Sequence, residues 1–248
     1  GRYDLALPLY EQTLALRKAK LGSDHPETLR SMRGLAAGYL SVGKADLALP
    51  LLEEAVTLHK AKVGPDHPNT LASISGLADA YRLAGKFDLA VALSEQAFSL
   101  QKEKIGPDHP DTLASMSVLA AAYALVGKLD LAISISEQTL ALHQAKLGPD
   151  HPDTLESMNK LAAAYAEVGK FDLAVTLSEK TLTLQKAKFG AEHPFVLKTT
   201  HHHAVALLQV RRSDEAVPLF QGLIAAYRKA YSAEPAKLAT ALARIAAA

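Results

Sequence analysis

The tripeptide Asp-His-Pro recurs along this chain at a fixed interval of 42 residues. It begins at Asp24, Asp66, Asp108 and Asp150, and the variant Glu192-His193-Pro194 follows after one more interval. Glycines keep the same step, at Gly22, Gly64, Gly106, Gly148 and Gly190. A fixed period between about 20 and 50 residues is typical of a solenoid or array of stacked units. Residues 107–148 and 149–190 are identical at 29 of 42 positions, which indicates recent duplication or deliberate design.

Each period predicts two helices separated by a short turn. Pro110 suits the first turn of a helix, and the Asp-His pair before it can cap free backbone N–H groups. Gly127 tolerates positive φ and ends this first helix, and Asp130 begins a second helix that ends at Gly148. No segment alternates with period two over a strand length, so no sheet is expected.

The period also predicts the organisation of the chain. A lone second helix is expected from about Tyr3 to Leu21. Five full repeats follow, at 22–63, 64–105, 106–147, 148–189 and 190–231, and residues 232–248 hold a closing helix from about Glu234 to Ala247. Because no linker rich in Pro, Gly or Ser interrupts the period, a single domain is expected over 1–248.

The side chains within one period carry a family resemblance. The first predicted helix places Met32, Leu35, Ala36 and Tyr39 on one face, and the second contributes Ala48, Leu52 and Ala55. This pattern resembles the tetratricopeptide repeat (TPR), and the 42-residue period with Gly-x-x-His-Pro-x-Thr-Leu in the loop is similar to the kinesin-light-chain type. The resemblance implies an all-α fold, a right-handed α-solenoid of antiparallel helix pairs (a TPR superhelix). The chain departs from the pattern at Ser94, Ser136, Ser178, Leu207 and Arg211-Arg212.

Composition excludes several classes of function. Lys and Arg number 27 against 26 Asp and Glu, and this balance argues against nucleic acid as a partner. The absence of cysteine removes disulfides and thiolate zinc sites. No apolar run approaches the roughly 18 residues that span a bilayer, so no membrane partner is expected. With no signal peptide visible at Gly1, we expect a cytoplasmic protein, and the opening half-repeat suggests a piece of something longer.

The recurring polar residues predict structure rather than chemistry. The five histidines of the Asp-His-Pro motif lie one repeat apart, too far to converge on one metal ion, and are expected to bond locally at helix starts. His201-His202-His203 point about 100° apart on a helix, so they cannot chelate together, and His203 is expected to be buried. Recurrence of Glu53 and Asp46 in every repeat indicates capping or inter-helix bonds. With no phosphate-binding loop and no nucleophile elbow, we expect no enzyme activity and no cofactor.

The informative surface is the side of each first helix opposite its packing face. In TPR proteins the first helices line the concave groove, so the resemblance implies a partner-binding floor there. The predicted floor residues are Arg30, Arg33, Ala37, Asp79, Arg82, Ser117, Ala121, Leu125, Glu156, Asn159, Ala163, Glu167 and His201. Arginines gather towards the N-terminal end and glutamates towards the C-terminal end, so a protein or peptide ligand that is acidic at one end with an apolar middle would fit. An alternative explanation of the alanines is helix propensity or packing between first helices.

These observations predict a protein–protein interaction scaffold that binds a peptide or helical segment in the groove. Two alternatives remain: a self-assembly module, and a regulatory or sensor region of a larger protein. The residues that grip a terminal carboxylate in some TPR proteins are not matched here, nor is the Asn-rich groove that binds cargo in kinesin light chains. Weak end-to-end self-association is also expected, because Leu5, Leu9 and Leu16 of the lone second helix should stay exposed.

Overall fold

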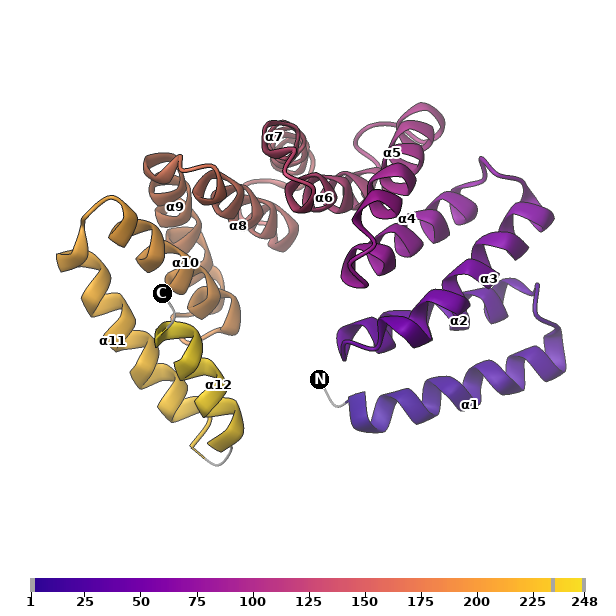
Figure 1. Cartoon of the computed structure of the whole chain (residues 1–248), viewed down its shortest axis with the longest axis horizontal. Helices are drawn as coiled ribbons and strands as arrows, with labels where there is room; N and C mark the ends of the chain where they lie inside the picture. Colours follow the sequence, from indigo (N-terminus) through magenta and orange to yellow (C-terminus); the bar gives the residue numbers. More distant parts are fainter. Residues whose placement is uncertain (1–2, 233–234, 247–248) are drawn as a thin grey trace. The chain divides into compact units, whose positions relative to one another are not determined.

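The computed structural model describes residues 3–232 and 235–246, and the regular structure within these ranges is entirely α-helical (Figure 1). The predicted all-α class is confirmed. The first helices of the five repeats are α2 (Pro26–Ser41), α4 (Pro68–Leu83), α6 (Pro110–Leu125), α8 (Pro152–Glu167) and α10 (Pro194–Gln209). The second helices are α1 (Tyr3–Leu21), α3 (Ala45–Val63), α5 (Phe87–Lys104), α7 (Leu129–Leu147), α9 (Phe171–Phe189) and α11 (Ser213–Ala230). The last helix is α12 (Pro235–Ala246).

The helices form two compact units, residues 1–135 and residues 136–248, and the division falls within α7. In the first unit each helix from α1 to α6 packs on the next, and the first helices α2, α4 and α6 also contact one another in succession. In the second unit α8 to α12 pack in the same order, and α8 contacts α10. The expected single domain over 1–248 stays a prediction.

A histidine side chain starts every first helix. In all five, the imidazole Nδ1 accepts a hydrogen bond from the backbone N–H two residues later, at 3.2 Å, and Pro occupies the first helical position. Such a bond satisfies one of the N–H groups that a helix start leaves free. The local role predicted for His25, His67, His109, His151 and His193 is therefore confirmed.

The turn inside each repeat depends on a left-handed backbone residue. Gly43, Gly85, Gly127 and Gly169 have φ of 75° to 76°. The N–H that follows each glycine reaches back to the carbonyl of the tyrosine five residues earlier, as Lys128 does to Tyr123 at 2.9 Å. This 6→1 bond is the Schellman end of a helix, and it turns the chain directly into the next helix.

The interior of each repeat is a seam of small and aliphatic side chains. Ala36 and Ala48 are fully buried and pack with Leu49 and Leu52. Small side chains at this crossing allow the two backbones to approach closely, so that the larger aliphatic groups on either side also become buried. The same pattern recurs with Ala174, Val175 and Leu207 in the second unit.

A tyrosine bonds each of the first helices α2, α4, α6 and α8 to the second helix that precedes it. The hydroxyls of Tyr39, Tyr81, Tyr123 and Tyr165 donate to Glu11, Glu53, Glu95 and Glu137 respectively, at 2.6 to 2.8 Å. Burial, together with the bond to Glu95, raises the pKa of Tyr123 to about 12. The inter-helix role predicted for the recurring glutamates is confirmed for Glu53, Glu95 and Glu137. For Glu179 the tyrosine position of the next first helix is Leu207, which has no hydroxyl to donate.

The helix limits differ from the predicted ones by a residue or two. The first helix that Gly127 was predicted to terminate ends at Leu125, and the second helix predicted to begin at Asp130 begins at Leu129. The closing helix extends over Pro235–Ala246, and the predicted limits Glu234 and Ala247 lie outside the described residues.

Candidate functional site

Three predicted floor residues lie exposed on α2. Arg30, Arg33 and Ala37 all face solvent, and the Arg30 side chain is 81% exposed with only a 3.9 Å approach to Glu27. Among the described residues no carboxylate pairs with Arg33. The floor of the first unit is therefore cationic and accessible at its α2 end.

The two predicted charged residues of α4 neutralise each other. The guanidinium of Arg82 donates to Asp79 Oδ1 through Nε at 2.9 Å and Nη2 at 2.7 Å. Both side chains are half-buried. Arg82 therefore adds little net positive charge to the floor, and the positive charge of the first unit's floor rests on α2.

On α6 the floor is uncharged. Ser117 and Ala121 are half-buried, and Leu125 is 48% exposed. Leu83, at the same position of α4, is also 48% exposed. Because α2, α4 and α6 lie in contact, these side chains extend the α2 surface with an apolar stretch. We call Arg30, Arg33, Ala37, Leu83, Ala121 and Leu125 the first-helix stripe.

In the second unit some of the predicted floor residues are exposed to solvent, and others pack against neighbouring helices. On α8, Glu156 lies 3.8 Å from Lys198 of α10, Ala163 is half-buried and Glu167 is exposed. His201 of α10 is half-buried and its ring packs edge-on against Phe220, with centroids 6.0 Å apart. Asn159 is buried, with 5% of its surface exposed.

Asn159 bonds one first helix to the next. Its Oδ1 accepts a hydrogen bond from Thr199 Oγ1 at 2.8 Å. Ser75, two repeats earlier at the same position, bonds Ser115 in the same way between α4 and α6. This link between successive first helices was missed by the sequence analysis. The sequence does carry a signal for this link, because one position of the first helices repeatedly holds a hydroxyl side chain: Ser73, Ser115, Ser157 and Thr199.

The histidine run of α10 serves packing. His203 is buried as predicted, and its Nδ1 lies 2.8 Å from Ser178 Oγ of α9. Forty-two residues earlier, the equivalents of His203 and Ser178 are Leu161 and Ser136. The histidine therefore occupies a position that holds leucine in the preceding repeat, and it bonds the serine that both repeats share. Burial lowers the pKa of His203, which favours the neutral ring. Among the described residues no three His, Asp or Glu side chains are placed to hold a metal ion.

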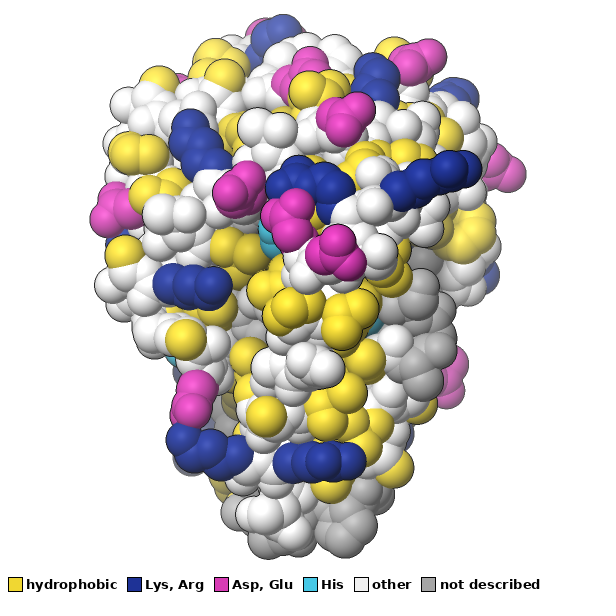
Figure 2. Space-filling model, turned by 90° about the vertical axis from the view of Figure 1, so that its left-hand side faces the viewer, with side chains coloured by type: hydrophobic (Ala, Val, Ile, Leu, Met, Phe, Trp, Pro, Cys, Tyr) yellow, Lys and Arg dark blue, Asp and Glu magenta, His cyan; other side chains and the backbone are white. Residues whose placement is uncertain are grey.

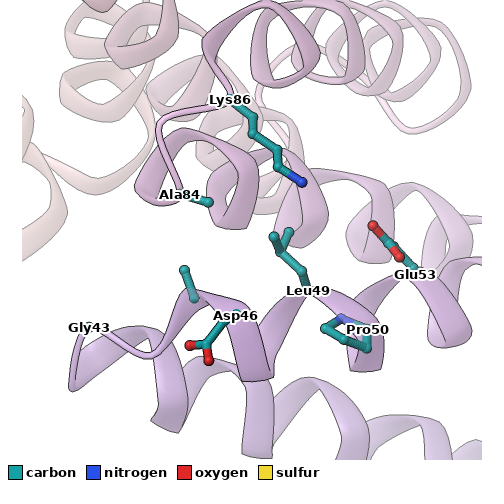
Figure 3. A pocket seen from close by; sticks show the side chains of 8 residues that line it. Gly43, Asp46, Leu49, Pro50, Glu53, Ala84 and Lys86 are labelled. Atoms are coloured by element: carbon teal, nitrogen blue, oxygen red, sulfur yellow. The ribbon is translucent and has the colours of Figure 1, made fainter.

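A pocket of about 550 Å³ lies in the first unit, beside α3 and the turn between α4 and α5 (Figure 3). Its lining includes Asp46, Leu49 and Glu53 of α3 together with Lys86. Glu53 is engaged by Tyr81, and the Lys86 ammonium lies 5.4 Å from the centre of the Tyr81 ring. The pocket contains no residue of the first-helix stripe, and two of its polar side chains, Glu53 and Lys86, serve the contact with Tyr81.

A comparison with protein-family models finds the same repeat along most of the chain. The tetratricopeptide repeat model matches residues 1–61, 34–103, 76–145, 111–187 and 153–229. The chain belongs to the tetratricopeptide repeat family. TPR repeats are generally protein–protein interaction scaffolds, and the resemblance drawn from Met32, Leu35, Ala36 and Tyr39 is confirmed.

Solved structures agree with this family. The nearly identical TPR-like repeats of a Podospora anserina protein described as a kinesin light chain share 35% identity, with a TM-score of 0.72 over 83% of this chain and 98% of that one. BtubC (BKLC) from P. vanneervenii has 16% identity and a TM-score of 0.75 over 94% and 93% of the two chains. MamA from Desulfovibrio magneticus has 15% identity and a TM-score of 0.57 over 81% and 96%. The last two show the fold alone.

A comparison with curated proteins found no match. Among the described helices of this TPR chain, none is both long and apolar enough to cross a membrane.

Proposed function

We propose that this TPR chain is an interaction scaffold that binds a protein segment along the first-helix stripe. The observation that carries the proposal is the stripe itself. Two arginines without a strong ion pair lie exposed on α2, and two leucines with half of their surface in water follow on α4 and α6. A face used only for packing would bury its leucines and pair its arginines.

The chemistry of the stripe selects the partner. An extended or helical segment with Asp or Glu at one end would meet Arg30 and Arg33, and apolar side chains next to them would cover Leu83 and Leu125. Exposed charges mainly steer association, whereas buried apolar anchors carry most of the affinity. The proposed segment therefore runs from acidic to apolar.

A selection from a library of random peptides tests the proposal. The wild-type chain should enrich peptides with an acidic end followed by apolar residues. The double variant Arg30→Glu/Arg33→Glu should bind these peptides about tenfold more weakly, the change that about 1.4 kcal/mol of lost attraction produces. The matched control is Lys44→Glu/Lys60→Glu, because both lysines are exposed but lie at the start of α3 and on α3.

The control should keep the wild-type affinity. Equal weakening in both double variants would mean that net charge, and not the stripe, decides binding. Enrichment of peptides without acidic residues would remove the role proposed for Arg30 and Arg33.

A further inference from the structure

The pocket beside α3 has two ends, and a different acidic side chain lies at each of them. Its volume is about 550 Å³, and α3 contributes both Asp46 and Glu53 to its lining. These residues are seven positions apart, which separates them by about 10 Å along the helix axis. In Figure 3 their carboxylates lie towards opposite ends of the pocket, and the Lys86 side chain reaches in from the turn between α4 and α5. One small ligand group therefore cannot contact both carboxylates.

The Glu53 end of the pocket is already engaged by contacts within the chain. The Tyr81 hydroxyl donates to Glu53 Oε1 at 2.8 Å, and the Lys86 ammonium lies 5.4 Å from the centre of the same Tyr81 ring. A hydrogen-bond donor and a cation are thus present at this end. A positive group of a ligand gains less here than at the other end.

The Asp46 end carries a negative charge without a partner. Asp46 is exposed, and among the side chains that the structure describes no Lys, Arg or His nitrogen lies within ion-pair distance of its carboxylate. On the face of the molecule in Figure 2, by contrast, most Asp and Glu side chains lie next to a Lys or Arg. The Asp46 carboxylate is therefore free to accept hydrogen bonds from a ligand.

Pro50 adds a second acceptor at the same end. It lies inside α3, four residues after Asp46, and it has no N–H to donate. The main-chain carbonyl of Asp46 consequently lacks the donor that an α-helix normally provides. In α5 the equivalent residues are Asp88 and Ala92, and Ala92 can supply this bond. Asp46 therefore offers a carboxylate and a carbonyl, whereas Asp88 offers a carboxylate alone.

The rest of the Asp46 end is apolar. Ala45, Leu49, Pro50 and Ala84 line the pocket. Leu47 is 44% exposed and is three residues before Pro50, so the two side chains are neighbours on the surface of α3. A matching ligand has several hydrogen-bond donors and a positive charge at its tip, an apolar stem, and a further apolar group beside it.

We propose that this pocket binds an arginine side chain of a partner protein, and that an apolar residue next to the arginine covers Leu47. A guanidinium keeps its positive charge and presents five N–H donors in one plane, so it can bond the Asp46 carboxylate and carbonyl together. Its three-carbon stem can lie against apolar surface. Lysine presents a single compact charge and matches two acceptors less well.

This site is separate from the first-helix stripe. The stripe lies on α2, α4 and α6, whereas Asp46, Leu47 and Pro50 belong to the second helix α3. Binding at the pocket does not require binding along the stripe. The two surfaces also differ in charge, because arginines lead the stripe and an aspartate leads the pocket.

A titration of the whole chain with the peptide amide acetyl-Leu-Arg, followed by ¹H–¹⁵N NMR, tests the site. The amide signals of Gly43, Leu47 and Lys86 should shift, with a dissociation constant of about 1 mM, as a small ligand in an open pocket gives. The same peptide with citrulline in place of arginine has the same shape without the charge. It should bind at least about fivefold more weakly.

A pair of matched variants assigns the binding to Asp46. Asp46→Asn should weaken binding of acetyl-Leu-Arg amide at least about fivefold. Asp88→Asn removes the same charge from the same position of α5, where the aspartate is also exposed, and should bind like the wild type. Because each aspartate is the second residue of its helix, any effect on helix stability is common to both variants.

Four results would overturn the proposal. No shift at about 10 mM peptide would mean that the pocket binds no arginine. Wild-type affinity of Asp46→Asn would exclude the acceptors of Asp46, and equal weakening by Asp88→Asn would assign the effect to net charge. Shifts of equal size at Gly85, Leu89 and Lys128, one repeat further along the chain, would show that the peptide does not select this pocket.

Discussion

At position 211 an arginine holds the backbone conformation that the four preceding repeats give to glycine. Its φ is 60°, against 75° to 76° for Gly43, Gly85, Gly127 and Gly169, and the Arg212 N–H still bonds the Leu207 carbonyl at 2.9 Å. The left-handed region costs an L-residue with a Cβ of the order of 1 kcal/mol. The Schellman turn is therefore kept in the fifth repeat at the expense of local strain.

Arg211→Gly should raise the free energy of unfolding by about 1 kcal/mol, because glycine adopts this conformation without strain. Urea unfolding followed by circular dichroism measures the change. Gly127→Arg should lower stability by a similar amount and serves as the reciprocal variant. If Arg211→Gly instead lowered the free energy of unfolding, contacts of the arginine side chain would stabilise the fold by more than its left-handed backbone destabilises it.

Two histidines, one buried and one half-buried, occupy one repeated position between a second helix and the next first helix. His59 Nδ1 lies 3.0 Å from Ser73 Oγ, and His143 Nδ1 lies 2.8 Å from Ser157 Oγ. Burial lowers the pKa of both rings below the ordinary value of 6.5. Gln101 and Gln185 fill the same position in the second and fourth repeats and are fully buried, so an uncharged side chain can be packed there.

Stability should fall as the pH falls below about 6.5, because the unfolded chain then binds protons that the folded rings resist. His59→Gln/His143→Gln should flatten this fall, since glutamine does not titrate. Urea midpoints at pH 7.5 and pH 5.5 measure it for both proteins. His202 and His203, whose pKa burial also lowers, are present in both and contribute equally to each. Parallel pH profiles for the two proteins would contradict the assignment to His59 and His143.

At the scale of the helix, local signals determined the limits that the sequence predicted well. Histidine, proline and glycine act on their own turn of backbone, so each first helix begins at its proline, and the turns of the first four repeats lie at their glycines. Which of the predicted floor residues are exposed and which are buried depends on the neighbouring helix, and the sequence pattern does not place that helix. A helical wheel places Asn159 and Ala163 on one side, but only the distance to α10 decides that Asn159 bonds Thr199 and is buried. Pairing of Arg82 with Asp79 likewise depends on the chosen rotamers, which periodicity does not specify.

The tyrosine bridge and the histidine cap should differ in their effect on helix packing. Tyr123→Ala removes a buried ring at the junction of α6 with α5 and should cost about 3–5 kcal/mol. His109→Ala removes one local cap of α6 and should cost about 1 kcal/mol or less. Tyr123→Phe, which keeps the ring and loses only the bond to Glu95, should lie between them. Urea unfolding orders the three variants, and a larger loss for His109→Ala would reverse the two roles.

For the whole molecule, the period of 42 residues predicted the class, the helix order and the family, because one interval repeated along the chain leaves few ways to stack helices. Periodicity could not tell which of two equally exposed leucines is available to a partner. Leu125 and Leu131 are both 48% exposed, yet Leu125 lies on the first-helix stripe and Leu131 lies on the second helix α7. The proposed binding of a partner along the stripe is the property that would separate them.

The affinity of a library-selected peptide for Leu125→Ser and Leu131→Ser tests that property most directly. Burying an exposed leucine against a partner contributes about 1.5 kcal/mol, so Leu125→Ser should weaken binding about tenfold while the thermal melt stays unchanged. Leu131→Ser should bind like the wild type in the same fluorescence titration. Equal affinities of both variants, or a loss confined to Leu131→Ser, would contradict binding on the first helices and place the partner on another face.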